Sequence, residues 1–421
     1  MGFNPVIPVG NLVEYSRGGG WGKETPFEGS SRVAIIRGAD FPSVAQGSYG
    51  GLPVRYEKDS KVNSVALRAG DIVLENSGGT DSRPTGRTVF VTNELIDAYD
   101  CPVIPASFCR LLRFDNRANS EFVYYWLQEM YSAGRTWGYQ NRSTGLSNFQ
   151  YKVFADSELL PDLPIEVQSK IASVLSAFEK KIRENNRQNG YLLELLKASA
   201  KNLYAEYERN EELELPVGWR WIEVDEISEM VCRGITPKYN PNSDETVLGQ
   251  TCVRNNLVLL ENGRLHSPKK VTEKWLQQYD LLINSTGVGS LGRTAQIWFE
   301  PTKLVVDSHV TIVRCKDEKH ALYLGFWAFE HEKYIESLHT GSTGQTELPR
   351  DHVKAIRLVL PSDEVLEGFN KMSKPSVRLI AANQEESKRL ADLRDALLPK
   401  LMSGEIDVSR IDLTQLNSHL A

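Results

Sequence analysis

The sequence predicts a mixed α/β (α+β) chain with two globular domains, each a mixed sheet with small helices. Three observations predict this class. The chain has 421 residues, which is too long for one ordinary hydrophobic core. Short motifs recur in the same order about 200 residues apart, which indicates an internal repeat. Two long stretches space their apolar residues in heptads, which is typical of paired helices.

The repeat consists of five features that occur in both halves. In chain order they are GDIVLENSG and YDLLINSTG at 70–78 and 279–287, a GRT triplet at 86–88 and 292–294, an alternating strand from Phe108 and from His309, an aromatic helical segment, and an STG triplet at 143–145 and 342–344. Turn residues separate short β-branched runs in each copy, which predicts a twisted antiparallel sheet. An LP step then leads into a heptad stretch in each copy, at 163–164 and 360–361.

The first heptad stretch covers 164–208 and would form a helix roughly 66 Å long. Its predicted seam is Ile171, Leu175, Phe178, Ile182, Asn185, Asn189, Leu192, Leu196, Ser199 and Leu203. An apolar stripe about two residues in seven wide needs a partner helix. The alternative is a single amphipathic helix lying on a globular core. Asn185 and Asn189 favour a helix pair, because seam amides fix register.

The expected partner helix lies in the same chain. Its seam is predicted as Val365, Phe369, Met372, Ser376, Leu379, Asn383, Glu386, Leu390, Leu393 and Leu397. Pro375 falls inside this stretch and predicts a kink or a new helix start.

Composition excludes several classes of protein. Hydrophobic residues make up 41% and charged residues 25%, no apolar run reaches the length of a membrane span, and the N-terminus lacks a signal sequence, so a cytoplasmic protein is expected. Five scattered cysteines and seven unclustered histidines predict neither disulfides nor a metal site. Phosphate-loop, nucleophile-elbow and dinucleotide motifs are missing, and so is the NPP tetrapeptide of amino-methyltransferases, so no catalytic residues are predicted.

The chain has a net charge of −6, but residues 1–150 are neutral, with 15 basic and 15 acidic side chains. Weak DNA binding by the chain alone is therefore expected, because phosphate affinity follows clustered Lys and Arg. Two polar and aromatic loops are nevertheless suited to base edges and phosphates. The candidate DNA contacts are Arg83, Arg87, Arg135, Trp137, Tyr139, Gln140, Asn141, Arg142, Lys269, Lys270, Arg293, His339, Thr340, Ser342, Thr343 and Gln345. Plain turn chemistry is the alternative explanation of both loops.

Three stretches resemble a known family. LPDLPIEVQSKIASVLSAFEKKIRENNRQN, LPVGWRWIEVDEI from Leu215 and LRDALLPKLMSGEIDV from Leu393 are similar to conserved regions of the specificity subunit (HsdS) of type I restriction-modification systems. The resemblance implies target-recognition domains at 1–160 and 213–360 and conserved coiled-coil helices at 161–212 and 361–421, the latter with the tail. It further implies that an antiparallel helix pair separates the two domains, with internal pseudo-twofold symmetry.

The resemblance also implies partners: double-stranded DNA, two methyltransferase (HsdM) subunits and two restriction (HsdR) subunits. S-adenosylmethionine, ATP and Mg are then expected on the partner subunits, with no cofactor on this chain and no membrane contact. Similar domains with different loops would read a bipartite, asymmetric DNA target. Two alternatives stay open: a recognition subunit for a type II methyltransferase-nuclease, and a coiled-coil assembly scaffold without DNA contact.

Overall fold

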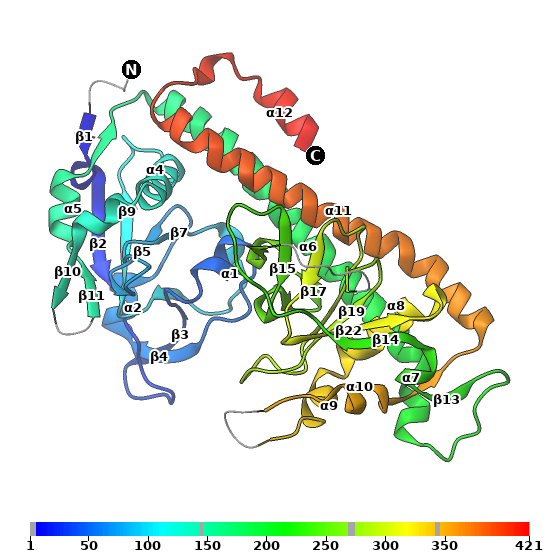
Figure 1. Ribbon diagram of the computed structural model, residues 1–421. Helices are drawn as coiled ribbons and strands as arrows, with labels where there is room; N and C mark the ends of the chain where they lie inside the picture. Colours follow the sequence, from blue (N-terminus) through cyan, green and yellow to red (C-terminus); the bar gives the residue numbers. More distant parts are fainter. Residues whose placement is uncertain (1–5, 144–145, 268–273, 342–345, 421) are drawn as a thin grey trace. The chain divides into compact units, whose positions relative to one another are not determined.

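The computed structural model describes residues 6–143, 146–267, 274–341 and 346–420 (Figure 1). The chain divides into two compact units. Unit 1 comprises Met1–Arg187 and Glu385–Ala421, and unit 2 comprises Gln188–Gln384. Each unit therefore contains part of both long helices, α6 (Ile165–Arg209) and α11 (Asp363–Met402).

The described residues of unit 1 form four small sheets. An antiparallel sheet has the order β2-β9-β5-β7, a mixed sheet has the order β4-β3-β8, and β10-β11-β6 and β1-β12 complete the set. The strands are β1 (Val6–Pro8), β2 (Val13–Gly18), β3 (Ser30–Ile36), β4 (Val54–Lys58), β5 (Ile72–Glu75), β6 (Ser77–Gly79), β7 (Thr88–Phe90), β8 (Val103–Pro105), β9 (Cys109–Phe114), β10 (Gln140–Ser143), β11 (Leu146–Phe149) and β12 (Leu159–Pro161). The helices, apart from α6 and α11, are η1 (Val9–Leu12), α1 (Phe41–Ala45), α2 (Asp59–Val65), α3 (Asn93–Asp97), α4 (Ser120–Ser132), η2 (Arg135–Tyr139), α5 (Tyr151–Ser157), η5 (Val408–Arg410) and α12 (Leu413–Leu420).

Unit 2 repeats the main sheets of unit 1. Its antiparallel sheet has the order β14-β22-β19-β20, its mixed sheet has the order β18-β15-β21, and β13-β23 corresponds to β1-β12. The strands are β13 (Arg220–Glu223), β14 (Ser228–Arg233), β15 (Glu245–Leu248), β16 (Val253–Arg254), β17 (Leu257–Val258), β18 (Arg264–His266), β19 (Leu281–Asn284), β20 (Thr294–Gln296), β21 (Leu304–Val306), β22 (Val310–Cys315) and β23 (Arg357–Leu360). The helices are α7 (Val224–Ile227), η3 (Gln250–Cys252), η4 (Leu260–Asn262), α8 (Glu318–Glu330), α9 (Glu332–Ser337) and α10 (Arg350–Lys354).

The repeated GD and YD motifs form the same buried ion pair in both units. Asp71, at the start of β5, accepts from Arg113 on β9 at 2.7 Å. Asp280 precedes β19 in the same way and accepts from Arg314 on β22 at 2.7 and 2.8 Å. Each aspartate also accepts a backbone N–H from three residues earlier, which closes the turn into the central strand. The sequence repeat therefore records one folding unit used twice.

The GRT triplets recur because both turns need glycine. Gly86 and Gly292 have φ angles of 94° and 81°, in the left-handed region that side chains disfavour. A Cβ atom would lie 2.8 Å from the Phe149 ring in the first case and 2.8 Å from the Glu332 carbonyl oxygen in the second. A larger residue at either position would be strained and would clash with Phe149 or with the backbone of α9.

The aromatic helical segments become α4 and α8, which cover the central sheets. Asn119 caps α4 by accepting the N–H of Phe122. In unit 1, α4 packs with residues 171–178 of α6 in one hydrophobic core. In unit 2, α8 packs with residues 193–204 of α6 and with the first half of α11. The apolar stripe of α6 thus meets a globular core as well as a helix.

The two long helices run antiparallel within each unit. In unit 1, Glu179 contacts Arg394 at 3.5 Å and Asn185 donates to Glu386 at 2.7 Å. Residue numbers therefore rise along α6 while those of the partner residues fall along α11, which is the antiparallel arrangement. In unit 2, Asn383 donates to Asn189 Oδ1 at 2.9 Å. The two seam amides of α6 therefore have different partners.

The phase of the predicted seams is partly wrong. Leu379 and Leu393 are 40% and 48% exposed, so they do not belong to the seam. Phe369 is buried as predicted, but the buried residues around it are Leu366, one position after the predicted Val365, and Ser373, Val377 and Ile380. Met372 and Glu386 are exposed too, whereas Ser199 is half-buried. The reason is that both helices also pack on the sheet domains, which demands a broader stripe than a strict heptad.

Most of the other predicted seam residues lie on or beside the buried side of the helices. Ile171, Leu175, Phe178, Asn185, Asn189, Leu196, Asn383 and Leu390 are buried, whereas Ile182, Leu192 and Leu397 are half-buried. The helix α11 continues through Pro375, so the new helix start expected there is wrong. The mixed α/β class with two long helices is confirmed.

Candidate nucleic-acid interface

In unit 1 the candidate loop is joined to the turn that follows the central strand. The loop starts at Gly134 and continues through η2 into the hairpin β10-β11. The strand β11 then pairs with β6, directly after β5. Residues 77–87 therefore lie beside residues 134–143 and 146–149, although these segments are far apart in sequence.

Arg135 and Tyr139 hold this loop in place. Arg135 pairs with Glu129 at 2.7 Å and with Glu158 at 3.0 Å, and Tyr139 donates to Glu158 at 2.9 Å. Burial raises the pKa of Tyr139, so it stays a neutral donor. Trp137, between them, is 39% exposed. Arg135 and Tyr139 thus have supporting contacts, and Trp137 is presented at the surface.

Gln140 fastens the loop to the neighbouring turn. Its Oε1 accepts from both the backbone N–H and the hydroxyl of Thr85, at 2.9 and 3.0 Å. Asn141, the next residue, is exposed. Arg142 lies in β10, and its side chain is outside the described part of the structure. Among the predicted amides, Asn141 is the one presented for contact.

Arg83 and Arg87 share one buried carboxylate at the end of β5. Glu75 is 2% exposed, and it accepts from Arg87 at 2.6 and 2.9 Å and from Arg83 at 3.2 Å. Arg83 and Arg87 also donate to the carbonyl oxygens of Gly78 and Gly38. One carboxylate between two guanidinium groups leaves one net positive charge, and the Arg83 side chain is 36% exposed. This arrangement suits a phosphate.

The corresponding place in unit 2 is lined by amide and hydroxyl groups. Asn284, at the end of β19, is fully buried and donates to the carbonyl oxygen of Gln250 at 3.1 Å. The side-chain amide of Gln250 donates to Thr286 Oγ1 at 2.8 Å, and Thr286 Oγ1 bonds Nδ1 of His309 at 2.9 Å. These groups offer hydrogen bonds without a fixed charge.

The second candidate loop meets this place as well. Glu347 forms bridge pairs with both Thr286 and Thr340. His339 is exposed, and its Nδ1 bonds the carbonyl oxygen of Glu336. Arg293 is half-buried and forms no ion pair within the described ranges. The predicted contacts Lys269, Lys270, Ser342, Thr343 and Gln345 lie outside the described residues.

Sequence reasoning missed the residues that hold these loops. Glu75, Asn148, Gln250, Thr286 and His309 all contribute to the two surfaces. Glu75 and Asn284 occupy the same position of the repeat, four residues after the aspartate that both halves share, Asp71 or Asp280. This shared position at the end of a repeated strand is the sequence signal that could have identified Glu75 and Asn284 as site residues.

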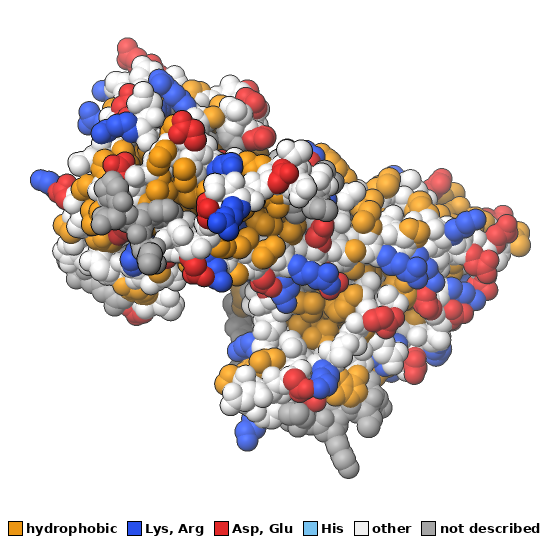
Figure 2. All heavy atoms as spheres, turned by 90° about the horizontal axis from the view of Figure 1, so that it is seen from above, with side chains coloured by type: hydrophobic (Ala, Val, Ile, Leu, Met, Phe, Trp, Pro, Cys, Tyr) orange, Lys and Arg blue, Asp and Glu red, His pale blue; other side chains and the backbone are white. Residues whose placement is uncertain are grey.

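The surface carries mixed charge. On the face shown in Figure 2, Lys and Arg side chains lie among Asp, Glu and hydrophobic side chains rather than in one continuous patch. Within residues 6–143, 146–267, 274–341 and 346–420, no group of three or more His, Cys, Asp or Glu is arranged to hold a metal ion. No helix in those ranges is long and apolar enough to cross a membrane.

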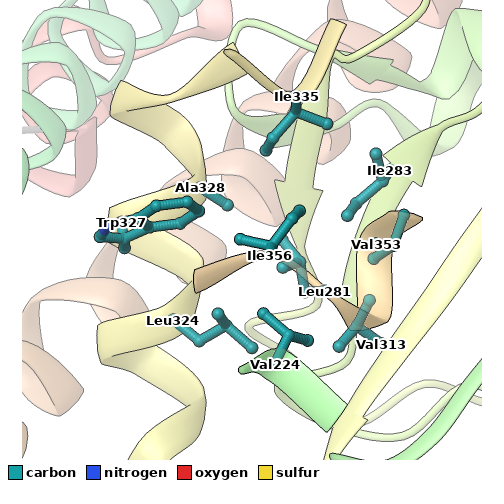
Figure 3. A pocket seen from close by; sticks show the side chains of 10 residues that line it. All are labelled: Val224, Leu281, Ile283, Val313, Leu324, Trp327, Ala328, Ile335, Val353 and Ile356. Carbon is teal, nitrogen blue, oxygen red and sulfur yellow. The ribbon is translucent and has the colours of Figure 1, made fainter. Parts of the chain in front are cut away.

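Unit 2 also contains a small cavity, which Figure 3 shows between α8, α10 and the central sheet. Its lining includes Leu281, Leu324, Trp327 and Val353, and every lining side chain is hydrocarbon or aromatic. A cavity without a polar group cannot orient a substrate.

Comparison with known proteins gives relatives of one kind. The chain is 25% identical over 267 residues to the type I restriction enzyme MjaIX specificity subunit of Methanocaldococcus jannaschii, covering 58% of this chain and 60% of that protein. It is 34% identical over 85 residues to the HindI specificity subunit of Haemophilus influenzae, covering 20% and 18%. The matched regions thus span 60% or less of these two relatives. No family model matches the sequence.

The fold has a solved counterpart. The crystal structure of a type I restriction-modification system S subunit from M. genitalium superimposes with a TM-score of 0.58 at 14% identity, covering 95% of this chain and 96% of that one. The resemblance predicted from the three conserved-looking stretches is confirmed. The chain is a relative, in sequence and in fold, of the specificity subunits of type I restriction enzymes.

Proposed function

We propose that this chain is the non-catalytic, sequence-specific DNA-recognition subunit of a type I restriction-modification complex. One observation carries the proposal: two units of the same topology present chemically different side chains at the same strand end. A shared scaffold with different loops is what reading two unlike DNA segments requires. The target would then be bipartite and asymmetric, with each unit reading one half.

The two halves would be read by different chemistry. Unit 1 offers a net positive cluster of Glu75, Arg83 and Arg87 beside the exposed Trp137 and Asn141. Unit 2 offers the neutral hydrogen-bonding groups around Thr286. The first surface suits phosphate contacts with an amide on a base edge, and the second suits hydrogen bonds to base edges.

Catalysis would belong to partner subunits. The family resemblance suggests two methyltransferase subunits, which would carry S-adenosylmethionine, and two restriction subunits, which would use ATP and Mg. On α6, Tyr191 and Leu195 are 71% and 58% exposed one turn apart, which suits contact with another protein. In each half-site a target adenine would be flipped out of the duplex into a partner's pocket. Because the chain has little clustered positive charge, tight DNA binding is expected only from the assembled complex.

The test is a map of methylated adenines in a host that carries this gene with its neighbouring methyltransferase gene, against the same host without this gene. A new gapped, asymmetric motif methylated on both strands is expected. If both proteins are expressed and associated and no motif appears, the chain is a scaffold and the proposal is overturned.

Loop variants assign the halves. Replacing Trp137 and Asn141 with alanine should change one half-site alone. The matched change in unit 2, His339 and Thr340 to alanine, should change only the other half. All four side chains are at least partly exposed, so the fold is expected to persist. An unchanged motif in both variants would contradict base reading by these loops.

A further inference from the structure

Unit 1 presents an aromatic ring at the start of a repeated strand, at a residue that was not among the candidate DNA contacts. Phe108 lies in the turn between β8 and β9, and its side chain is 60% exposed. Burying a phenylalanine gains about 2 kcal/mol, so such exposure gives up stability. Within the stretch PASFCR, Phe108 is the one large apolar residue.

The backbone holds this ring beside the candidate interface. The carbonyl oxygen of Phe108 accepts the N–H groups of Asn76 and Ser77, at 2.7 and 3.1 Å. Ser77 opens β6, the strand that joins the hairpin β10-β11. The N–H of Cys109 closes the turn on Ala106 at 2.8 Å. The ring is therefore carried by a rigid turn rather than by a loose loop.

The groups around the ring are polar and partly unused. The side-chain oxygen of Asn76 is buried and has no hydrogen-bond partner within the described structure. Nε of Arg110 is in the same condition, and Arg110 forms no ion pair within the described ranges. Ser77 donates to Asn148 at 2.5 Å. The guanidinium group of Arg110 also donates to Ser16 Oγ at 3.0 Å and lies 4.4 Å from the centre of the Tyr151 ring. An exposed ring among hydrogen-bonding side chains suits a nucleic-acid surface.

Unit 2 places a different side chain at the same position. His309 precedes β22 as Phe108 precedes β9, and its carbonyl oxygen accepts the N–H of Ser285 at 2.9 Å. His309 is exposed, and its Nδ1 bonds Thr286. The repeat therefore offers an apolar ring in one unit and a hydrogen-bonding ring in the other, at one equivalent site.

On the basis of the proposed function, we propose that Phe108 and His309 are specificity-determining residues that contact DNA bases, one in each half-site. Phe108 makes an apolar or stacking contact, and His309 makes a hydrogen bond. Each ring is presented next to the strand-end turn whose side chains supply the remaining contacts. Exchange of chemistry at this one position contributes to the asymmetry of the target.

The experiment uses the full chain assembled with its methyltransferase partner. Phe108→Ala, Phe108→His and His309→Phe are compared with wild type by methylation mapping and by binding to a duplex with the wild-type motif. The matched control is Leu159→Ala, which changes a 45% exposed side chain on β12 of the same unit. Thermal melting of each variant checks that the fold is retained, and Phe108→Tyr keeps the ring.

Phe108→Ala should weaken binding about tenfold, the effect of losing one base–aromatic contact. Both Phe108→Ala and Phe108→His should relax or change base preference in one half-site, and His309→Phe should do so in the other. Phe108→Tyr and Leu159→Ala should keep the motif. If Phe108→Ala and Phe108→His keep the wild-type motif and affinity, the inference is overturned while the proposed function stands. If wild type yields no motif, the proposed function itself fails.

Discussion

At the end of its central strand unit 1 has the buried carboxylate of Glu75, whereas unit 2 has the buried amide of Asn284 at the equivalent position. The carboxylate accepts hydrogen bonds from two arginines. The amide donates to the carbonyl oxygen of Gln250, whose side chain in turn donates to Thr286. Four residues earlier, at the start of the central strand, the two units are alike, because both bury an Asp–Arg ion pair. The comparison teaches that the scaffold tolerates a change of charge at the strand end provided that the loop above it changes too.

The largest effect is expected from breaking the shared ion pair. Arg314→Met would leave Asp280 buried at 1% exposure without its cation and should destabilise unit 2 by about 4 kcal/mol. Arg113→Met should cost unit 1 less, because the Arg113 side chain is 21% exposed against 9% for Arg314. Hydrogen exchange of β5 and β19 peptides in the full chain would separate the two effects. The control is Lys354→Ala, which breaks an exposed pair with Asp225. Equal, small effects from Arg314→Met and this control would contradict the prediction.

The next effect distinguishes the two strand ends. Glu75→Gln would remove the carboxylate from Arg83 and Arg87 and should destabilise the loops of unit 1 by about 2 kcal/mol. In the methylation map it should weaken one half-site and leave the other unchanged. Glu24→Gln is the matched control, since the Glu24 side chain is 84% exposed. Loss of both half-sites would show that the effect is not local to unit 1.

A smaller effect is expected in the helix pair, where the seam amides differ between the units. Asn383→Leu would leave the oxygens of Asn189 and Gln188 without their donor and should cost about 1 to 2 kcal/mol. Adding Asn189→Leu should recover most of this cost, because the Asn189 side-chain oxygen that lost its donor is then removed as well. Denaturant unfolding of both single variants and the double variant forms a thermodynamic cycle. Strictly additive losses would rule out coupling between the two amides.

The smallest effect is a pH dependence confined to unit 1. Burial, with repulsion from Glu179, raises the pKa of Glu121 to about 7. The folded state therefore binds more protons than the unfolded state, so the stability from this group falls as pH rises from about 4.5 to 7. Glu121→Gln imitates the protonated form and should match wild type at pH 4.5. At pH 8 it should exceed wild type by about 1 kcal/mol, a figure reduced for partial exposure.

Melting curves across this pH range would check the Glu121 prediction. Glu14→Gln, at an exposed carboxylate on β2, is the control variant. A stability difference between Glu121→Gln and wild type that is the same at every pH would refute the assignment.

The amino-acid sequence by itself determined the repeat, the two long helices and the family resemblance. These are local or periodic properties: the aspartates at 71 and 280 and the glycines at 86 and 292 are needed by turns that each unit must form. Heptad spacing likewise predicts a helix wherever it occurs.

Only the tertiary structure decided which side chains meet. The partners of Asn185, the exposure of Leu379 and Leu393, and the use of Arg87 on Glu75 depend on contacts between segments far apart in sequence. The sequence did not identify Phe108 as a site residue, because its exposure depends on the turn whose carbonyl oxygen accepts from Asn76 and Ser77. Periodicity states which residues share a face of one element, but it cannot state what packs against that face.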